Sequence, residues 1–173
     1  MIRLLATILL LPLPLWIGIR VYRAVVFKIE CSGHIKRAAD ANTTELASQE
    51  MKVVVDYLEQ HSMTSGYTSV LYRTPDEDVG FWYINLKSSL EELKKVKTGT
   101  SQLERSNLLL KLRQTLLDQK EMGESVTTPK GISIFPHNTA FAFFGIFGHG
   151  AFALGILLWA SPLFKLFKPS GNS

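Results

Sequence analysis

A stretch of 26 residues without a charged side chain, Thr139 to Phe164, constrains this chain more than any other feature. A helix on the surface of a soluble domain keeps one polar face, whereas a helix built from this stretch is apolar on every side. About 20 apolar residues suffice to cross the roughly 30 Å hydrocarbon core of a bilayer. The sequence therefore predicts a transmembrane helix over residues 139–164, followed by a short basic tail over residues 165–173.

A second apolar segment lies near the N-terminus. Leu4 to Ile19 is a run of sixteen uncharged residues, about 24 Å of helix at 1.5 Å per residue, and apolar side chains continue to Phe27. Arg20 and Arg23 can extend their charged ends to the lipid headgroups. We predict a transmembrane helix over residues 4–27, bent by its two prolines. A cleaved signal peptide is the alternative, but an arginine lies close to each candidate cleavage site, which favours an uncleaved anchor.

The charged residues are concentrated outside the two apolar segments. All 15 acidic residues lie between Glu30 and Glu124, and the stretch 28–138 is nearly neutral, so the formal net charge of +4 comes from the flanks of the apolar segments. Positive charge is expected there beside lipid headgroups, and it does not indicate nucleic-acid binding. Two spans place both termini on the same side. The short arginine-led N-terminus favours an extracytoplasmic domain, whereas Arg20 and Arg23 favour the opposite side.

Residues 28–138 are expected to form a helical domain. Apolar residues recur at helical spacing over about 35–60, 75–97 and 102–119, which predicts three helices. One face of the first helix carries Ile35, Ala39, Leu46, Met51, Val54 and Leu58. One face of the second carries Val79, Trp82, Tyr83, Leu86, Leu90 and Leu93. The predicted fold is therefore mainly α, with two transmembrane helices flanking a small helical bundle.

Capping patterns mark where the later helices begin. Thr74 with Glu77, and Ser101 with Glu104, have the spacing of a capping box. In the third helix, three leucines repeat every seven residues: Leu103, Leu110 and Leu117. Three neighbouring leucines reinforce this repeat: Leu109, Leu112 and Leu116. Alternating residues from 126 to 135 allow a short two-stranded β element with residues 68–72.

Small residues follow one face of the second apolar segment. They recur at steps of three or four residues: Ala142, Gly145, Gly148, Ala151 and Gly155. Small side chains allow the backbone of another helix to approach closely, so this face is predicted to be a helix-packing seam. The first apolar segment is the nearest candidate to fill it, and a second copy of the chain or a foreign membrane subunit are the alternatives.

His149 lies near the middle of the same segment. An ionisable side chain at that depth is costly and often functional. A neutral histidine with one hydrogen bond to a neighbouring helix is the simpler interpretation. Proton, metal or haem chemistry at His149 would require a complex with another protein. The first apolar segment offers only Thr7 as a polar side chain that could act together with His149.

Three consecutive aromatic residues, Phe81, Trp82 and Tyr83, are predicted to form a contact surface. Successive helical residues point about 100° apart, so the three cannot all face one core, and at least one must lie on the surface. Aromatic side chains are enriched in protein–protein contacts and at membrane interfaces. The acidic run at 76–78 just before them is typical of a helix start rather than a metal site.

The sequence contains no phosphate-binding loop, nucleophile elbow or pair of CxxC motifs, and Cys31 is its single cysteine. We therefore expect no catalytic, cofactor or metal site. The favoured function is a non-catalytic integral membrane protein, an accessory or assembly subunit that acts through helix–helix and protein–protein contacts. Its expected partners are the lipid bilayer and a membrane protein or a second copy, with no nucleic acid. A membrane-anchored sensor or ligand-binding module is the alternative, and a redox role at His149 comes third.

Overall fold

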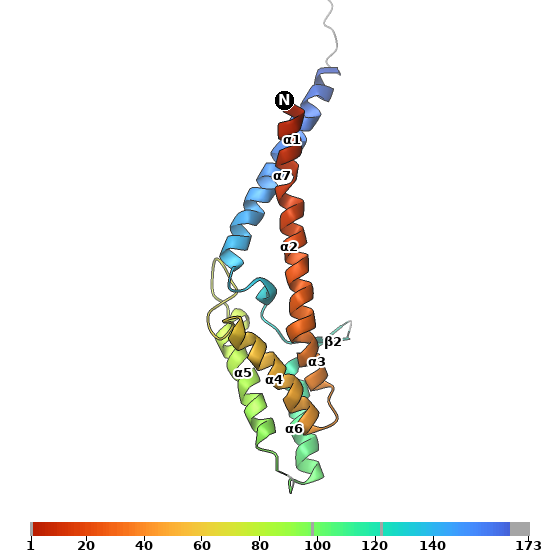
Figure 1. Cartoon of the computed structure of the whole chain (residues 1–173), viewed down its shortest axis with the longest axis vertical. Helices are drawn as coiled ribbons and strands as arrows, with labels where there is room; N and C mark the ends of the chain where they lie inside the picture. Colours follow the sequence, from red (N-terminus) through yellow and green to blue (C-terminus); the bar gives the residue numbers. More distant parts are fainter. Residues whose placement is uncertain (1, 98, 122, 167–173) are drawn as a thin grey trace, which may run out of the picture. The chain divides into compact units, whose positions relative to one another are not determined.

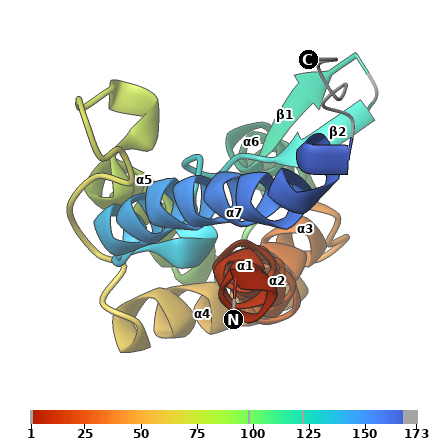
Figure 2. The ribbon, with the colours of Figure 1, turned by 90° about the horizontal axis from the view of Figure 1, so that it is seen from above.

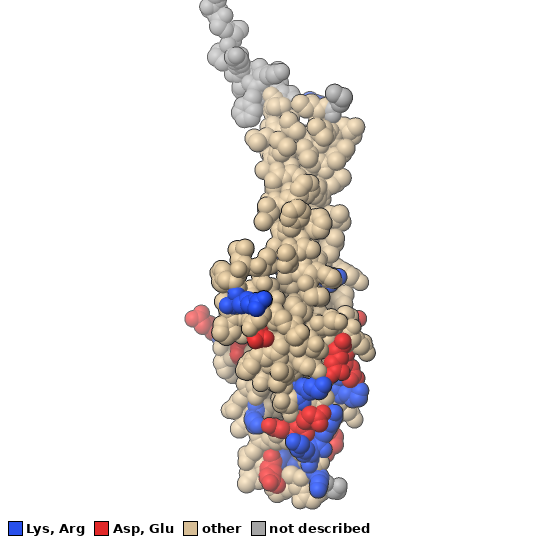
Figure 3. Space-filling view, turned by 90° about the vertical axis from the view of Figure 1, so that its left-hand side faces the viewer, with Lys and Arg blue, Asp and Glu red and all other residues tan. Residues whose placement is uncertain are grey.

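The computed structural model describes residues 2–97, 99–121 and 123–166. It is mostly helical with a small two-stranded antiparallel sheet, which confirms the predicted fold class. The chain divides into two compact units, residues 1–22 with 139–173 (unit 1) and residues 23–138 (unit 2). Figure 1 labels the helices and strands, and on the face shown in Figure 3 the charged side chains gather on unit 2. The predicted tail at 165–173 lies mostly outside the described residues.

Unit 1 is built from three helical segments, α1 (Ile2–Leu10), the first part of α2 (Pro12–Phe27), and α7 (Asn138–Leu166). Proline has no backbone N–H to continue a helix but is tolerated in a first turn, which explains why α1 ends just before Pro12 and α2 begins there. Among the described residues, two helices are long and apolar enough to cross a membrane, Ile2–Ala39 with 38 residues and Asn138–Ser161 with 24.

Unit 2 is a helical bundle with a β-hairpin (Figures 1 and 2). In chain order, its elements after α2 are as follows: a π-helical turn, η1 (Lys28–Ser32), α3 (Gly33–Ala39), α4 (Thr44–Gln60), a 3-10 turn, η2 (Pro75–Glu77), α5 (Val79–Lys94), α6 (Gln102–Leu116), β1 (Leu117–Lys120), β2 (Gly123–Val126) and η3 (Ile132–Ile134). The bundle core is continuous across these helices and is centred on fully buried residues that include Ile35, Met51, Leu58 and Leu116.

The helix predicted over 35–60 is divided in two in the structure. Thr43 has an extended backbone, and its Oγ1 accepts a hydrogen bond from the Leu46 N–H at 3.2 Å, which makes it the N-cap of α4. Of the six residues predicted for the buried face, only Leu46 is exposed, and its neighbour Ala47 is buried in its place; the other five are Ile35, Ala39, Met51, Val54 and Leu58. Threonine is a strong N-cap residue because its side chain satisfies a backbone donor that has no partner in the first turn.

The six residues predicted for the core face of the second helix are all buried, which confirms that prediction. The helix begins later than the predicted 75 and ends at 94 rather than 97. Asp78, and not Thr74, is its N-cap, with Oδ1 accepting from the Phe81 N–H at 3.0 Å. Residues Pro75–Glu77 form the separate turn η2, in which the Thr74 hydroxyl donates to Glu77 Oε2.

The capping box at Ser101 and Glu104 is confirmed, whereas of the three leucines that repeat every seven residues only Leu117 is buried. Leu103 and Leu110 are 71% and 55% exposed. The buried side of α6 instead carries Leu112 and Leu116, with Leu109 packed partly against the core. A short helix packed on one bundle face needs a stripe with the 3.6-residue period, and a seven-residue repeat is sustained only in a supercoil.

The sheet pairs segments different from those predicted. β1 and β2 form an antiparallel hairpin in which Leu117 faces Val126 and Lys120 faces Gly123. The chain from 132 to 134 is a 3-10 turn, and residues 68–72 form no strand. Near them, the structure has only one isolated bridge between described residues 67 and 78. The hairpin is favoured because strands separated by two residues pair at small entropic cost.

Candidate functional site

The small-residue face of α7 lies against the first helices of the same chain. A Cβ built on Gly145 would lie 2.8 Å from Trp16 Cζ2, and one on Gly155 would lie 3.0 Å from the Ala6 carbonyl oxygen. A Cβ on Gly148 would lie 3.7 Å from Leu13 Cβ. Ala151 is buried and Ala142 is partly buried. The three glycines of the predicted seam, Gly145, Gly148 and Gly155, therefore lie against the chain's own N-terminal helices.

Trp16 is the residue that the sequence interpretation missed in this contact. Its indole Nε1 donates to the Phe141 carbonyl oxygen at 2.8 Å, and Arg20 lies over its ring at 4.9 Å from the centroid. Counting only hydroxyl side chains as polar hid this donor, although a tryptophan N–H usually finds a partner when it is buried. The sequence signal for this contact was the spacing of Trp16 three residues after Leu13, which places both side chains on one side of α2. That side faces α7.

His149 hydrogen bonds within its own helix. Its Nδ1 lies 2.7 Å from the Gly145 carbonyl oxygen, and because a carbonyl can only accept, Nδ1 carries the proton. The imidazole also meets the Trp16 ring edge to face, with centroids 5.9 Å apart. These two contacts account for the histidine by packing and hydrogen bonding.

The predicted aromatic contact surface is reduced to one residue. Trp82 and Tyr83 are buried in the unit 2 core, and Phe81 is 64% exposed. The 100° step between helical residues required at least one of the three to face outwards, and that residue is Phe81. The Tyr83 hydroxyl reaches the surface and donates to Glu59 Oε1 at 2.6 Å. This hydrogen bond and a second one from Lys87 hold the pKa of the Glu59 carboxyl below its ordinary value of 4.5.

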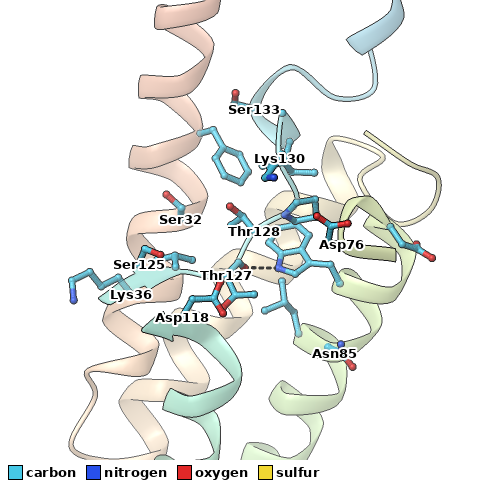
Figure 4. Close-up of a pocket in the computed structure, with 18 of the residues that line it drawn as sticks. Ser32, Lys36, Asp76, Asn85, Asp118, Ser125, Thr127, Thr128, Lys130 and Ser133 are labelled. Carbon is cyan, nitrogen blue, oxygen red and sulfur yellow. Dashed lines mark hydrogen bonds between the residues drawn. The ribbon is translucent and has the colours of Figure 1, made fainter. Parts of the chain in front are cut away.

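A groove of about 1000 Å³ opens on unit 2, and Figure 4 shows the side chains around it. One wall is the helix side from Ala24 to Lys36, and the other is the first turns of α5. The segment 127–133 passes between the walls and is fixed by Trp82, whose Nε1 donates to the Thr127 carbonyl at 2.9 Å. The hairpin residues 124–126 close one end. The groove could not be predicted from the sequence of any one helix, because four separate stretches of the chain form it.

The groove is lined by apolar side chains and by charged side chains of both signs. Apolar lining comes from Phe27, Phe81, Trp82, Leu86, Val126 and Ile132. Lys36 pairs with Asp40 at 2.8 Å, and Glu124 pairs with Arg113. The Oγ of Ser125 is buried without a hydrogen-bond partner among the described residues.

Two further histidines, His34 and His61, have structural contacts. His34 Nδ1 lies 2.5 Å from Glu50 Oε2, which joins α3 to α4. His61 stacks on Tyr57 with ring centroids 4.1 Å apart. In the part of the chain that the structure describes, no group of three or more His, Cys, Asp or Glu side chains is placed to hold a metal ion.

No protein-family model, curated protein or solved structure matches this chain. The groove and the helix contact are therefore the features from which a function can be argued.

Proposed function

We propose that this chain is a two-span integral membrane protein that acts as a non-catalytic accessory or assembly subunit, with the groove of unit 2 as the site that holds a partner protein. The groove is the observation that carries this proposal. Its volume of about 1000 Å³ lies within the range of small-molecule pockets, about 300–1,000 Å³, so its lining and not its size favours a protein partner. Aromatic and aliphatic side chains bordered by polar and charged ones are the usual composition of a protein–protein contact.

The membrane part of the proposal rests on the two long apolar helices and on their contact. Both helices exceed the length that the hydrocarbon core requires. Close backbone approach at Gly148 and Gly155, with one hydrogen bond from Trp16, is how helices pack in lipid, where burial from water gives no driving force. Because the chain itself occupies the small-residue face, the partner is assigned to unit 2 and not to α7.

Two spans would place the termini on one side and unit 2 on the other, and we propose the extracytoplasmic side for unit 2. A cysteine introduced at the exposed residue Glu45, in a Cys31→Ala background, tests this. We expect a membrane-impermeant maleimide to label it in intact cells. Labelling only after the membrane is opened would place the domain in the cytoplasm.

Helix pairing can be tested by cross-linking. With a Cβ–Cβ distance of 3.7 Å, Leu13→Cys with Gly148→Cys fits disulfide geometry, whose Cβ–Cβ range is about 3.5–4.5 Å. We expect an intramolecular disulfide in membranes that resist alkaline extraction. Leu13→Cys with Gly150→Cys is the matched control, because a Cβ at Gly150 meets nothing within 4 Å. Disulfide-linked dimers would instead assign the seam to a second copy.

The partner proposal is tested by a charge placed in the groove. Asn85 lines the groove and Ser88, one turn further along α5, is exposed outside it. We expect a stoichiometric membrane protein to copurify with the unmodified chain and with Ser88→Arg, and to be lost with Asn85→Arg. Equal recovery with both variants would contradict the assignment of the groove. A bound small molecule in native mass spectra, with no protein partner, would favour the ligand-binding alternative.

A further inference from the structure

The loop between α4 and α5 presents consecutive apolar side chains to solvent. Leu71 is 90% and Tyr72 is 74% exposed, and Val70 beside them is also exposed. Single exposed apolar residues are ordinary on protein surfaces, whereas adjacent ones mark a contact. Arg73 follows directly and places a cation at the edge of this apolar tip.

The loop is held in place at its base. Residues 67 and 78 form a β-bridge, the Thr68 N–H donates to the Glu77 carbonyl at 3.0 Å, and the Val79 N–H donates to the Gly66 carbonyl at 2.9 Å. Arg73 lies over the Tyr67 ring at 5.1 Å from its centroid. These contacts join both ends of the loop, so the exposure of its tip is a built feature of the domain.

The base of the loop lies beside the segment that leads into α7. A Cβ on Gly66, whose φ is +101°, would lie 3.4 Å from Phe135 Cζ. Phe135 is three residues before Asn138, where unit 2 ends and the second apolar helix begins. The loop therefore occupies the end of unit 2 at which the chain enters a membrane-spanning helix.

We infer that residues 70–73 insert into the headgroup region of the bilayer that the two apolar helices cross, so the occupant of this surface is lipid. This inference rests on the proposed membrane-spanning function. Leucine and valine side chains fit the upper acyl region, tyrosine is enriched at the headgroup level, and arginine pairs with lipid phosphates. The contact would fix unit 2 against the membrane surface, in addition to its covalent connections.

The test uses the full-length protein in vesicles that contain lipids spin-labelled near the headgroup. A single cysteine at Leu71, in a Cys31→Ala background, carries an environment-sensitive fluorophore. Leu103, 71% exposed at the first turn of α6, provides a matched control site. We expect a blue-shifted emission and at least a twofold loss of fluorescence with spin-labelled lipid at position 71, and neither effect at position 103.

Other outcomes distinguish a failure of the lipid contact at residues 70–73 from a failure of the membrane-spanning proposal. Equal fluorescence at positions 71 and 103, in protein that resists alkaline extraction, would overturn the lipid contact and leave the spans intact. A blue-shifted probe that spin-labelled lipid does not quench would assign the surface to a protein and also overturn it. Release of the protein by alkaline extraction would remove the membrane-spanning basis, and the inference with it.

Discussion

Gly155 is the position at which a single added methyl group should separate the two helices of unit 1. A Cβ there would lie 3.0 Å from the Ala6 carbonyl oxygen and 3.0 Å from Leu10 Cδ2. Normal contacts between carbon atoms are about 3.5–4.0 Å. The Leu10 side chain can rotate away, but the Ala6 oxygen belongs to the helix backbone, so α1 and α7 must move apart by a few tenths of an ångström. A gap that approaches about half an ångström forfeits about a quarter of the attraction between each contacting pair.

For Gly155→Ala we expect helix pairing to weaken by about 1–2 kcal/mol. Overpacking costs about 1–3 kcal/mol, and the lower part of that range applies because the Leu10 side chain can rotate away. A change of one or two kcal/mol corresponds to about a 5- to 30-fold change in an equilibrium constant. Gly150→Ala is the matched control, because the added methyl meets nothing within 4 Å.

The assay is the equilibrium between the disulfide of the Leu13→Cys, Gly148→Cys protein and a glutathione redox buffer in vesicles. This equilibrium gives the effective concentration of one thiol at the other, which measures helix pairing. We expect that concentration to fall about 5- to 30-fold with Gly155→Ala and to stay unchanged with Gly150→Ala. Equal values for the two variants would refute the packing contact from which the magnitude was derived.

Three further predictions follow from other contacts. Trp16→Phe removes the donor to the Phe141 carbonyl and should weaken pairing in the same assay by about 0.6–1.7 kcal/mol, the range for interhelical hydrogen bonds in membranes, whereas Trp159→Phe should not change it. Cys31 is fully buried, so a thiol reagent should label it only in denaturant, and rapid labelling of the native protein would contradict its position in the core. Tyr83→Phe removes the first cause of the low Glu59 pKa, so an NMR titration should show that pKa rising towards 4.5. Because the folded pKa is depressed, the stabilising contribution of Glu59 is present above 4.5 and is lost as pH falls through the folded value.

Features that depend on neighbours along the chain could be predicted from the sequence. The six core residues of α5 were identified because a helix packed on one side repeats its apolar residues at a fixed period. The capping box at Ser101 was readable because both of its hydrogen bonds join residues three apart. The two apolar helices followed from the length of their uncharged stretches, residues 4–19 and 139–164.

Competition between local signals was harder to judge from the sequence. Periodicity predicted one helix over 35–60 and did not show that Thr43 would cap a new one. The leucines of α6 offered two stripes of similar strength. Packing against α3 and α4 selected the stripe of Leu112 and Leu116, because a bundle face needs a period of 3.6 residues rather than seven.

The sequence by itself determined the apolar spans, the helical character of the domain and the small-residue face of α7, since each is a property of one continuous segment. Only the tertiary structure decided what covers that face, which aromatic residue stays exposed, and where the groove lies. The groove combines a helix wall near residue 28, the start of α5, a hairpin and the segment 127–133. These stretches are brought together by burial of a shared core, which no local pattern specifies, because burial is non-directional and depends on which faces finally meet.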